Sequence, residues 1–332
     1  MVGWSSAGVI GIAEHNGPLV AQLGMTTRPT IAGCSLNPLA PVARLMLTGC
    51  FTLPTPMKPD PHSGLVPYDI NVELWTDGTK KRRWIALPDG GSMTQSANGA
   101  WAAPSGTMVV KEFAIETTPG DSTTRRPVET RFLVNTDTGW MGFTYRWRLD
   151  GTDADLLSDQ GVTYTWPLST GGTYTHYYPS RTQCRSCHHS SHGPLLGLRP
   201  EQLQRKYDYH GVIAEQLPTL AQLGVGPDSA ATPLPSPYDP HETADRRVRG
   251  YMASNCAHCH NASYISIKDM RITTPLAQTR LCEVITPGSP TMSRLHDLVS
   301  SRPGMPALGT LVVDPLAVEL VDTWITGMTT CP

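Results

Sequence analysis

The chain contains two copies of the five-residue pattern C-x-x-C-H, at residues 184–188 and 256–260. The pattern places two thiols three positions apart, with an imidazole directly after the second thiol. Two thiols at this spacing add across the two vinyl groups of one porphyrin, and the imidazole then lies under the iron as its proximal ligand. The sequence therefore predicts two covalently bound haem c groups, and a core that is partly cofactor.

In each copy the cysteines are predicted to form thioether bonds and the histidine to bind iron. Two other chemistries use C-x-x-C pairs, and both explain less. A structural zinc site often has two such pairs roughly 15–20 residues apart, and these copies are separated by much more. A redox-active pair usually sits in a βαβ unit and does not need the histidine. The predicted attachment residues are Cys184, Cys187, Cys256 and Cys259, and the predicted proximal ligands are His188 and His260.

Met305 is the predicted distal ligand of the second iron. It precedes Pro306 in the loop before the last predicted helix, which is where a distal ligand is expected. A thioether opposite an imidazole raises the potential of the iron. Met292 and Met328 are the alternatives, since a lone methionine also serves to fill gaps in a core.

The distal ligand of the first iron cannot be chosen from the sequence. His189 is too close to His188 to reach the opposite face of the same haem. A six-coordinate iron transfers electrons, whereas an open position binds oxygen, peroxide or another small ligand. The choice therefore bears directly on function. Besides a lysine or an empty position, the open candidates are His192, His210, Met252, Met141, Met108 and His176.

Four of the eight cysteines lie outside the two motifs, and an even remainder fits two disulfides. The local pairing is Cys34–Cys50 with Cys282–Cys331, although four cysteines allow three connectivities and free buried thiols are the alternative. Haem attachment of this type takes place outside the cytoplasm, where disulfides persist. We therefore expect an exported protein, periplasmic or extracellular.

Composition excludes several partners. The formal net charge of −2 gives no field for nucleic acid or anionic lipid. No run of 18 apolar residues is present, so no transmembrane segment is expected. The apolar stretch at residues 7–13 is too short and lacks a basic flank for an export signal. The numbering is therefore expected to describe a processed or re-started chain.

Patterning predicts an α+β multidomain chain in four segments. Residues 1–50 are expected to form an extended N-terminal arm, and residues 51–180 a β-rich domain with strands near 107–115, 129–134 and 142–149. Residues 181–240 hold the first haem-binding segment, a short helix from about 199 to 207, and a Pro-rich linker. Residues 241–332 are expected to form an all-α, cytochrome c-like domain. Its last helix has Asp314 as N-cap, Pro315 at the first position and Gly327 after its end.

From about Cys50 to Cys331 the chain resembles a bacterial family of dihaem c-type cytochromes. The resemblance implies a β-rich N-terminal domain, two covalent haems and Met305 as a distal ligand. A shortened segment after Asn261 departs from the family pattern, and the first fifty residues do not match it. The matching stretches are residues 66–68, 73–84, 105–113, 128–132, 145–147, 152–154, 179–184, 255–261, 287–290 and 324–325, with the terminal Cys331.

Two covalent haems in an exported chain predict a relay that passes electrons between redox protein partners. The near-neutral charge and the expected arm also suit a subunit docked on a membrane-bound respiratory or photosynthetic complex, because a soluble shuttle more often carries a charged docking face. The alternative is a dihaem enzyme of peroxidase or oxygenase type with a five-coordinate first haem. Known dihaem peroxidases space their motifs much further apart, so electron transfer is favoured over catalysis.

Overall fold

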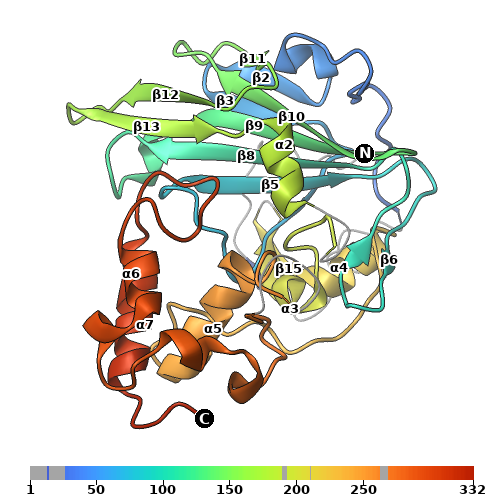
Figure 1. Cartoon of the computed structure of the whole chain (residues 1–332). Helices are drawn as coiled ribbons and strands as arrows, with labels where there is room; N and C mark the ends of the chain where they lie inside the picture. Colours follow the sequence, from blue (N-terminus) through green and yellow to red (C-terminus); the bar gives the residue numbers. More distant parts are fainter. Residues whose placement is uncertain (1–12, 15–26, 189–192, 210, 262–267) are drawn as a thin grey trace. The chain divides into compact units, whose positions relative to one another are not determined.

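The computed structural model describes residues 13–14, 27–188, 193–209, 211–261 and 268–332 (Figure 1). The protein combines sheets and helices, with most of its strands before residue 180, as the sequence predicts. Among the described residues no helix is long and apolar enough to cross a membrane. Contacts divide the chain into two compact units. Unit 1 comprises Met1–Asp69, Thr79–Arg185 and Leu198–Thr232, and unit 2 comprises Ile70–Gly78, Ser186–Gly197 and Pro233–Pro332.

Unit 1 is built on a six-stranded antiparallel sheet with the order β11-β10-β9-β8-β5-β4, whose strands from β11 to β5 are labelled in Figure 1. The three predicted strands are confirmed as β8, β9 and β10. Alternate residues of β10 are buried, as expected for a strand with one face on a core. The bounds are β4 Val66–Tyr68, β5 Lys80–Ala86, β8 Met108–Glu116, β9 Arg125–Thr136, β10 Gly139–Trp147 and β11 Ala154–Leu156.

Smaller elements complete unit 1. Two-stranded sheets pair β2 with β3, β6 with β7 and β12 with β13. In a mixed three-stranded sheet, β15 lies between β1, to which it is parallel, and β14, to which it is antiparallel. The bounds are β1 Ala13–Glu14, η1 Leu45–Thr48, β2 Phe51–Thr55, β3 Lys58–Pro61, β6 Thr94–Gln95, β7 Trp101–Ala102, η2 Ser122–Thr124, β12 Val162–Pro167, β13 Thr173–Tyr178, α3 Pro200–Leu203, β14 Lys206–Asp208, β15 Val212–Glu215 and α4 Gln216–Gln222.

The core of unit 1 is rich in aromatic side chains. Ring pairs such as Phe132–Tyr145 meet edge to face with centroids 5.8 Å apart, an arrangement that aromatic quadrupoles favour. The aromatic members of this cluster are Phe51, Trp84, Phe113, Phe132, Phe143, Tyr145, Trp147 and Trp166.

The described part of the predicted arm, residues 27–50, packs into unit 1. Leu45 is fully buried, and the Cys34–Cys50 disulfide closes the segment on itself. The guanidinium of Arg28 donates to the carbonyl oxygens of Pro88 and Gly91, both at 2.8 Å. These contacts tie the segment to the turn between β5 and β6, so its weak hydrophobic patterning conceals an ordered structure.

The helix predicted from about residue 199 to 207 is wrong in length. Helix α3 ends at Leu203, and Lys206–Asp208 instead forms strand β14. The physical reason is that Tyr207 of β14 pairs with Ala214 of β15. In addition, the side-chain amide of Gln216 donates to the carbonyl of Leu203 and closes the helix.

Unit 2 contains the longer helices, α5 Ala244–Asn255 and α7 Pro315–Thr326, with α6 Arg294–Ser300 between them. The predicted caps of α7 are confirmed, since Asp314 accepts from the N–H of Leu316 and Gly327 follows the last turn. Helices α5 and α7 pack through a shared core, and the indole of Trp324 donates to Asp245 at 3.1 Å. Three short 3-10 helices complete the set: η3 Leu276–Gln278, η4 Leu281–Val284 and η5 Pro290–Met292.

The C-terminal compact unit is not the predicted all-α segment of residues 241–332 alone. Residues 70–78, from the connection between β4 and β5, belong to it as well. The side chain of Asn255, at the end of α5, accepts from the N–H of Trp75 at 2.6 Å and donates to the carbonyl of Glu73 at 3.0 Å. Helix α5 therefore depends on a segment that lies far away in sequence.

Candidate cofactor-attachment site

The first motif begins inside helix α2, Arg181–Cys187. The helix starts with a capping box: the N–H of Gln183 donates to the hydroxyl of Ser180, and the N–H of Ser180 donates to the amide oxygen of Gln183. The first helical bond follows, from the N–H of Cys184 to the carbonyl of Ser180. Because residues three apart share a helix face, this start places Cys184 and Cys187 on one side of α2.

Cys184 lies against strand β10 where that strand has no side chain. A Cβ atom placed on Gly142 would be 3.5 Å from both Cβ and Sγ of Cys184. Next to it, the guanidinium of Arg181 stacks 5.1 Å from the centre of the Phe143 ring. Burial raises the pKa of the Cys184 thiol, and the neighbouring charge of Arg131 opposes the rise. The sheet of unit 1 therefore supports the first cysteine of the motif.

His188 has the tautomer that an iron ligand needs. Its Nδ1 lies 2.6 Å from the carbonyl oxygen of Pro194. A carbonyl only accepts, so Nδ1 carries the proton, and the lone pair of the neutral ring is on Nε2. Histidines that bind metals usually donate their other N–H to such a carbonyl, which fixes the ring and makes it more basic.

The second motif follows directly on helix α5. The N–H of Cys256 donates to the carbonyl of Met252, and the N–H groups of Cys259 and His260 both donate to the carbonyl of Cys256, at 3.0 and 2.8 Å. The amide of Asn261 donates to the carbonyl of Ala257 at 2.9 Å and closes the turn. The motif is therefore one continuous helical turn. The imidazole of His260 directly follows its second thiol.

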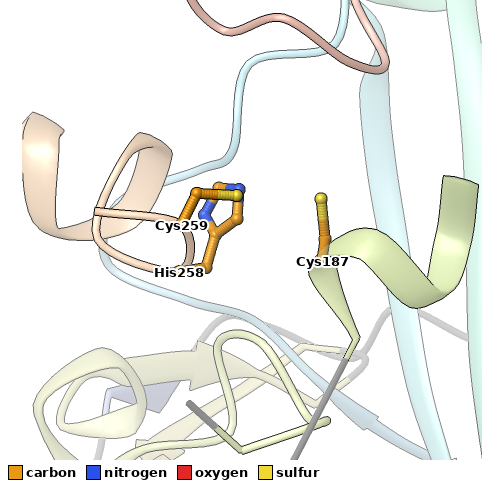
Figure 2. Close-up of side chains that lie close together, drawn as sticks. All are labelled: Cys187, His258 and Cys259. Carbon is orange, nitrogen blue, oxygen red and sulfur yellow. The ribbon is translucent and has the colours of Figure 1, made fainter. Parts of the chain in front are cut away.

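Parts of the two motifs meet within unit 2. The ligand atoms of Cys187, His258 and Cys259 all lie within 4.8 Å of one another (Figure 2). Hydrogen bonds from Cys187 and then from His258 lower the pKa of Cys259 to about 4. Sequence reasoning missed His258, because it occupies one of the two variable positions of its motif and the meeting is purely tertiary.

The residues present fit the attachment of haem. The four motif cysteines are free thiols, although the other four form disulfides Cys34–Cys50 and Cys282–Cys331, which confirms the predicted pairing. Each free pair stands on one helical turn, as a bond to both vinyl groups of one porphyrin requires. Burial lowers the pKa of His260, and this favours the neutral ring that binds metal.

Met305 lies in the loop between α6 and α7, with 37% of its surface exposed. Its N–H donates to the carbonyl of Leu298 at 2.6 Å, at the end of α6. Of the alternatives, Met292 is 73% exposed, and Met328 packs against the core between the helices. The assignment of Met305 to the second iron stays a prediction.

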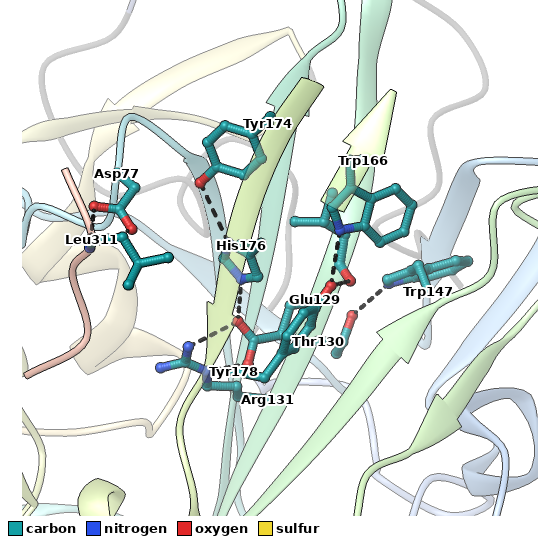
Figure 3. Close-up of polar contacts among 11 residues, drawn as sticks. Asp77, Glu129, Thr130, Arg131, Trp147, Trp166, Tyr174, His176, Tyr178 and Leu311 are labelled. Atoms are coloured by element: carbon teal, nitrogen blue, oxygen red, sulfur yellow. Dashed lines mark hydrogen bonds and ion pairs between the residues drawn. The ribbon is translucent and has the colours of Figure 1, made fainter. Parts of the chain in front are cut away.

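The Met305 loop is held by the segment 70–78. Both carboxylate oxygens of Asp77 accept from the N–H of Leu311, at 2.9 and 3.0 Å, and one of them accepts from Val312 at 2.9 Å (Figure 3). The indole of Trp75 donates to the carbonyl of Val312 at 3.1 Å. This anchor fixes the loop immediately before α7.

The structure removes His176 from the candidates for the first distal ligand. His176 is fully buried in unit 1, with Nε2 2.7 Å from the carboxylate of Glu129 and Nδ1 3.3 Å from the hydroxyl of Tyr174 (Figure 3). Both ring nitrogens therefore already have partners. Met108 is buried in the core of unit 1 with Met141 packed against it, and Met252 is buried in the core of unit 2. His189, His192 and His210 lie outside the described residues.

Comparisons of the chain with family models, with curated proteins and with solved structures gave no match. The resemblance to dihaem c-type cytochromes therefore rests on the sequence motifs, and the function is argued from the residues of the site.

Proposed function

We propose that this chain is an exported dihaem c-type cytochrome, of the bacterial family that it resembles, which relays electrons between redox partners. The observation that carries the proposal is the state of the two C-x-x-C-H motifs. Each is folded as a helical turn with two free thiols, and the two turns meet at Cys187 and Cys259. A relay needs its two redox groups close together, and this arrangement would hold two attached groups near each other.

The roles of the residues follow from the geometry. Haem c, when bound, supplies a one-electron iron couple. Cys184 and Cys187 fix the first group, and Cys256 and Cys259 fix the second. The hydrogen bond from Nδ1 to Pro194 orients the imidazole of His188. In this proposal residues 241–332 would act as a cytochrome c-like module, and His260 and Met305 would hold its iron.

Export and partners complete the proposal. Two disulfides are compatible with an oxidising compartment outside the cytoplasm. We place the protein in the periplasm or outside the cell, working with redox proteins or docked on a membrane-bound respiratory or photosynthetic complex. The net charge of −2 supports docking through shape and apolar contact more than through long-range attraction.

A second candidate function has a specific observation in its favour. Cys187, His258 and Cys259 form a three-ligand set of two sulfurs and one nitrogen, which suits a zinc ion with an open fourth position. The two candidates exclude each other, because both use the sulfurs of Cys187 and Cys259. They differ in their use of His258, which zinc would need and thioether formation would not.

The test combines the mass of the denatured protein with a zinc analysis of the folded protein, each produced in a host that attaches haem c, for the wild type and for His258→Ala. The cytochrome proposal expects two haem additions in both proteins. The zinc candidate expects no haem addition, about one zinc per wild-type chain, and loss of that zinc in His258→Ala. A Cys256→Ala/Cys259→Ala variant is the matched control and should keep one haem, at Cys184 and Cys187.

The enzyme alternative is separated by the spin state of the first iron. A relay expects a low-spin ferric spectrum from both haems and hydrogen peroxide turnover no faster than that of free haem. A stable high-spin signal from one haem, with rapid peroxide reduction, would replace the relay by a peroxidase-type enzyme.

A further inference from the structure

The side chain of Cys187 comes from the first motif, yet it belongs with the second motif in unit 2. From this meeting we infer that the two haems form one electronically coupled pair, joined edge to edge at the Cys187 and Cys259 thioethers. The inference rests on the proposed function and specifies it further. In this inference the two haems act together as one two-electron centre, and are not two independent one-electron carriers.

The first step of the argument is distance. The Sγ atoms of Cys187 and Cys259 lie within 4.8 Å of each other, and the thiol of Cys187 donates a hydrogen bond to Cys259. In a thioether the sulfur is one bond from a carbon that is itself attached to the porphyrin ring. With both groups attached, the ring edges that carry these carbons would lie no further apart than this distance plus four covalent bonds.

The second step is that both sulfurs have rigid supports. Cys187 is the last residue of helix α2, whose start is fixed by the capping box of Ser180 and Gln183. Cys259 stands in a turn closed by bonds to the carbonyl of Cys256 and by the amide of Asn261. Neither sulfur is carried on a loop that lacks hydrogen bonds of its own.

The third step concerns the surroundings of the contact. His258 is only 8% exposed and lies beside both sulfurs, so the contact is partly shielded from water (Figure 2). Charges interact more strongly where water is excluded. Residues that shield the contact in this way would strengthen the interaction between two haems held here, so the proposal expects their irons to be reduced at separate potentials even if their ligands are alike.

The experiment begins with wild-type protein that carries two haems by mass, so that a failure of haem attachment is recognised separately. Its circular dichroism in the Soret region is compared with the sum from two single-haem variants, Cys184→Ala/Cys187→Ala and Cys256→Ala/Cys259→Ala. A coupled pair gives a two-signed band in the wild type that is absent from the sum. A wild-type spectrum equal to the sum would overturn the inference while leaving the cytochrome proposal intact.

A second measurement uses the wild type alone, in case a single-haem variant does not fold. Electron paramagnetic resonance is recorded through a reductive titration. A coupled pair expects the ferric line shape to change when half of the iron is reduced, because each remaining ferric centre then has a diamagnetic neighbour. Two signals that only lose amplitude, each with an unchanged shape, would show that the haems are independent.

Discussion

The two C-x-x-C-H motifs have the same sequence pattern and different supports. The first follows strand β13 and has its Cys184 against the sheet at Gly142, and the boundary between the compact units passes just after Arg185. The second continues helix α5 and lies wholly inside unit 2, where α7 packs on α5. The pattern thus specifies only a local turn, while the two turns are supported by different cores.

This contrast indicates where each site can be disturbed without the other. Changes on the open face of β10 should act on the first motif, and changes around residues 70–78 should act on the second. Removing residues 1–180 would not separate them, because it would also remove the Asp77 anchor of the Met305 loop.

The largest effect is expected from Gly142→Leu. The new side chain must displace the Cβ and Sγ atoms of Cys184, which lie 3.5 Å from the position of its Cβ. We expect loss of most of the first haem and retention of the second, measured by mass on tryptic peptides. Gly142→Ala is the control and should retain both haems, since 3.5 Å is an ordinary contact for a methyl group. Equal loss at both sites would show that the sheet does not support the first motif selectively.

A second prediction concerns the free energy of unfolding, which the buried charge of unit 1 should affect. Glu129 is fully buried and binds Arg131 through both oxygens, besides its bond to His176. Glu129→Gln leaves Arg131 without its counter-charge, which costs about 3 kcal/mol of unfolding free energy. Glu116→Gln is the control, because Arg125, its partner, is half exposed and such pairs contribute less than about 1 kcal/mol. Comparable losses in the two variants would contradict the prediction.

The same variant gives a pH dependence. Burial alone would raise the pKa of Glu129, but Arg131 and His176 hold it below the ordinary value of 4.5. The stabilisation is therefore complete above pH 4.5 and is lost as the pH falls through the folded-state pKa. Denaturant unfolding should show the gap between wild type and Glu129→Gln narrowing in acid. A gap that stays constant from pH 7 to pH 3 would contradict the lowered pKa.

The two disulfides should contribute differently to stability, because they close loops of different length in the two units. The Cys282–Cys331 bridge joins residues 49 apart in unit 2, and Cys34–Cys50 joins residues 16 apart in unit 1. The chain-entropy model gives about 4 kcal/mol for the longer loop and about 3 kcal/mol for the shorter one. Replacing each pair by alanine should lower stability in this order, as measured by urea unfolding. A larger loss from the Cys34–Cys50 pair would indicate that native contacts outweigh loop entropy.

The smallest effect is expected at Asp77. In Asp77→Asn one acceptor oxygen is replaced by an N–H₂ group that faces the N–H of Leu311, which costs about 1–2 kcal/mol. We also expect a weaker long-wavelength sulfur-to-iron band, because the loop that carries Met305 is released. Asp150→Asn is the control, since Asp150 also accepts a backbone N–H, in an exposed turn of unit 1. An unchanged band would separate Met305 from the Asp77 anchor.

Local sequence signals predicted local structure well. The caps of α7 and the strands β8 to β10 depend on residues close in sequence or on simple alternation, and these predictions are confirmed. The disulfide pairing is also confirmed, although Cys282 and Cys331 lie 49 residues apart. The C-x-x-C-H pattern also located the free thiols. Apart from the disulfide pairing, each of these signals depends on residues that interact with near neighbours along the chain.

The tertiary partners could not be predicted in this way. No pattern connects Asn255 with Trp75, because the two meet only through the fold. His258 is one variable residue among many until Cys187 is placed beside it. The prediction of a helix over residues 199–207 was wrong for the same reason, since Lys206–Asp208 pairs with β15 as a strand.

The composition of unit 2 has a consequence for the order of assembly. The unit takes one part of its framework from residues 70–78, in the connection between β4 and β5, and another from helix α7, close to the end of the chain. A polypeptide delivered N-terminus first cannot finish this unit until its final helix arrives. Both pairs of motif thiols are delivered before that moment, so they pass through an interval without a completed core around them. If a cofactor is attached to these thiols, the attaching machinery would have access to them before α7 is in place and less access afterwards.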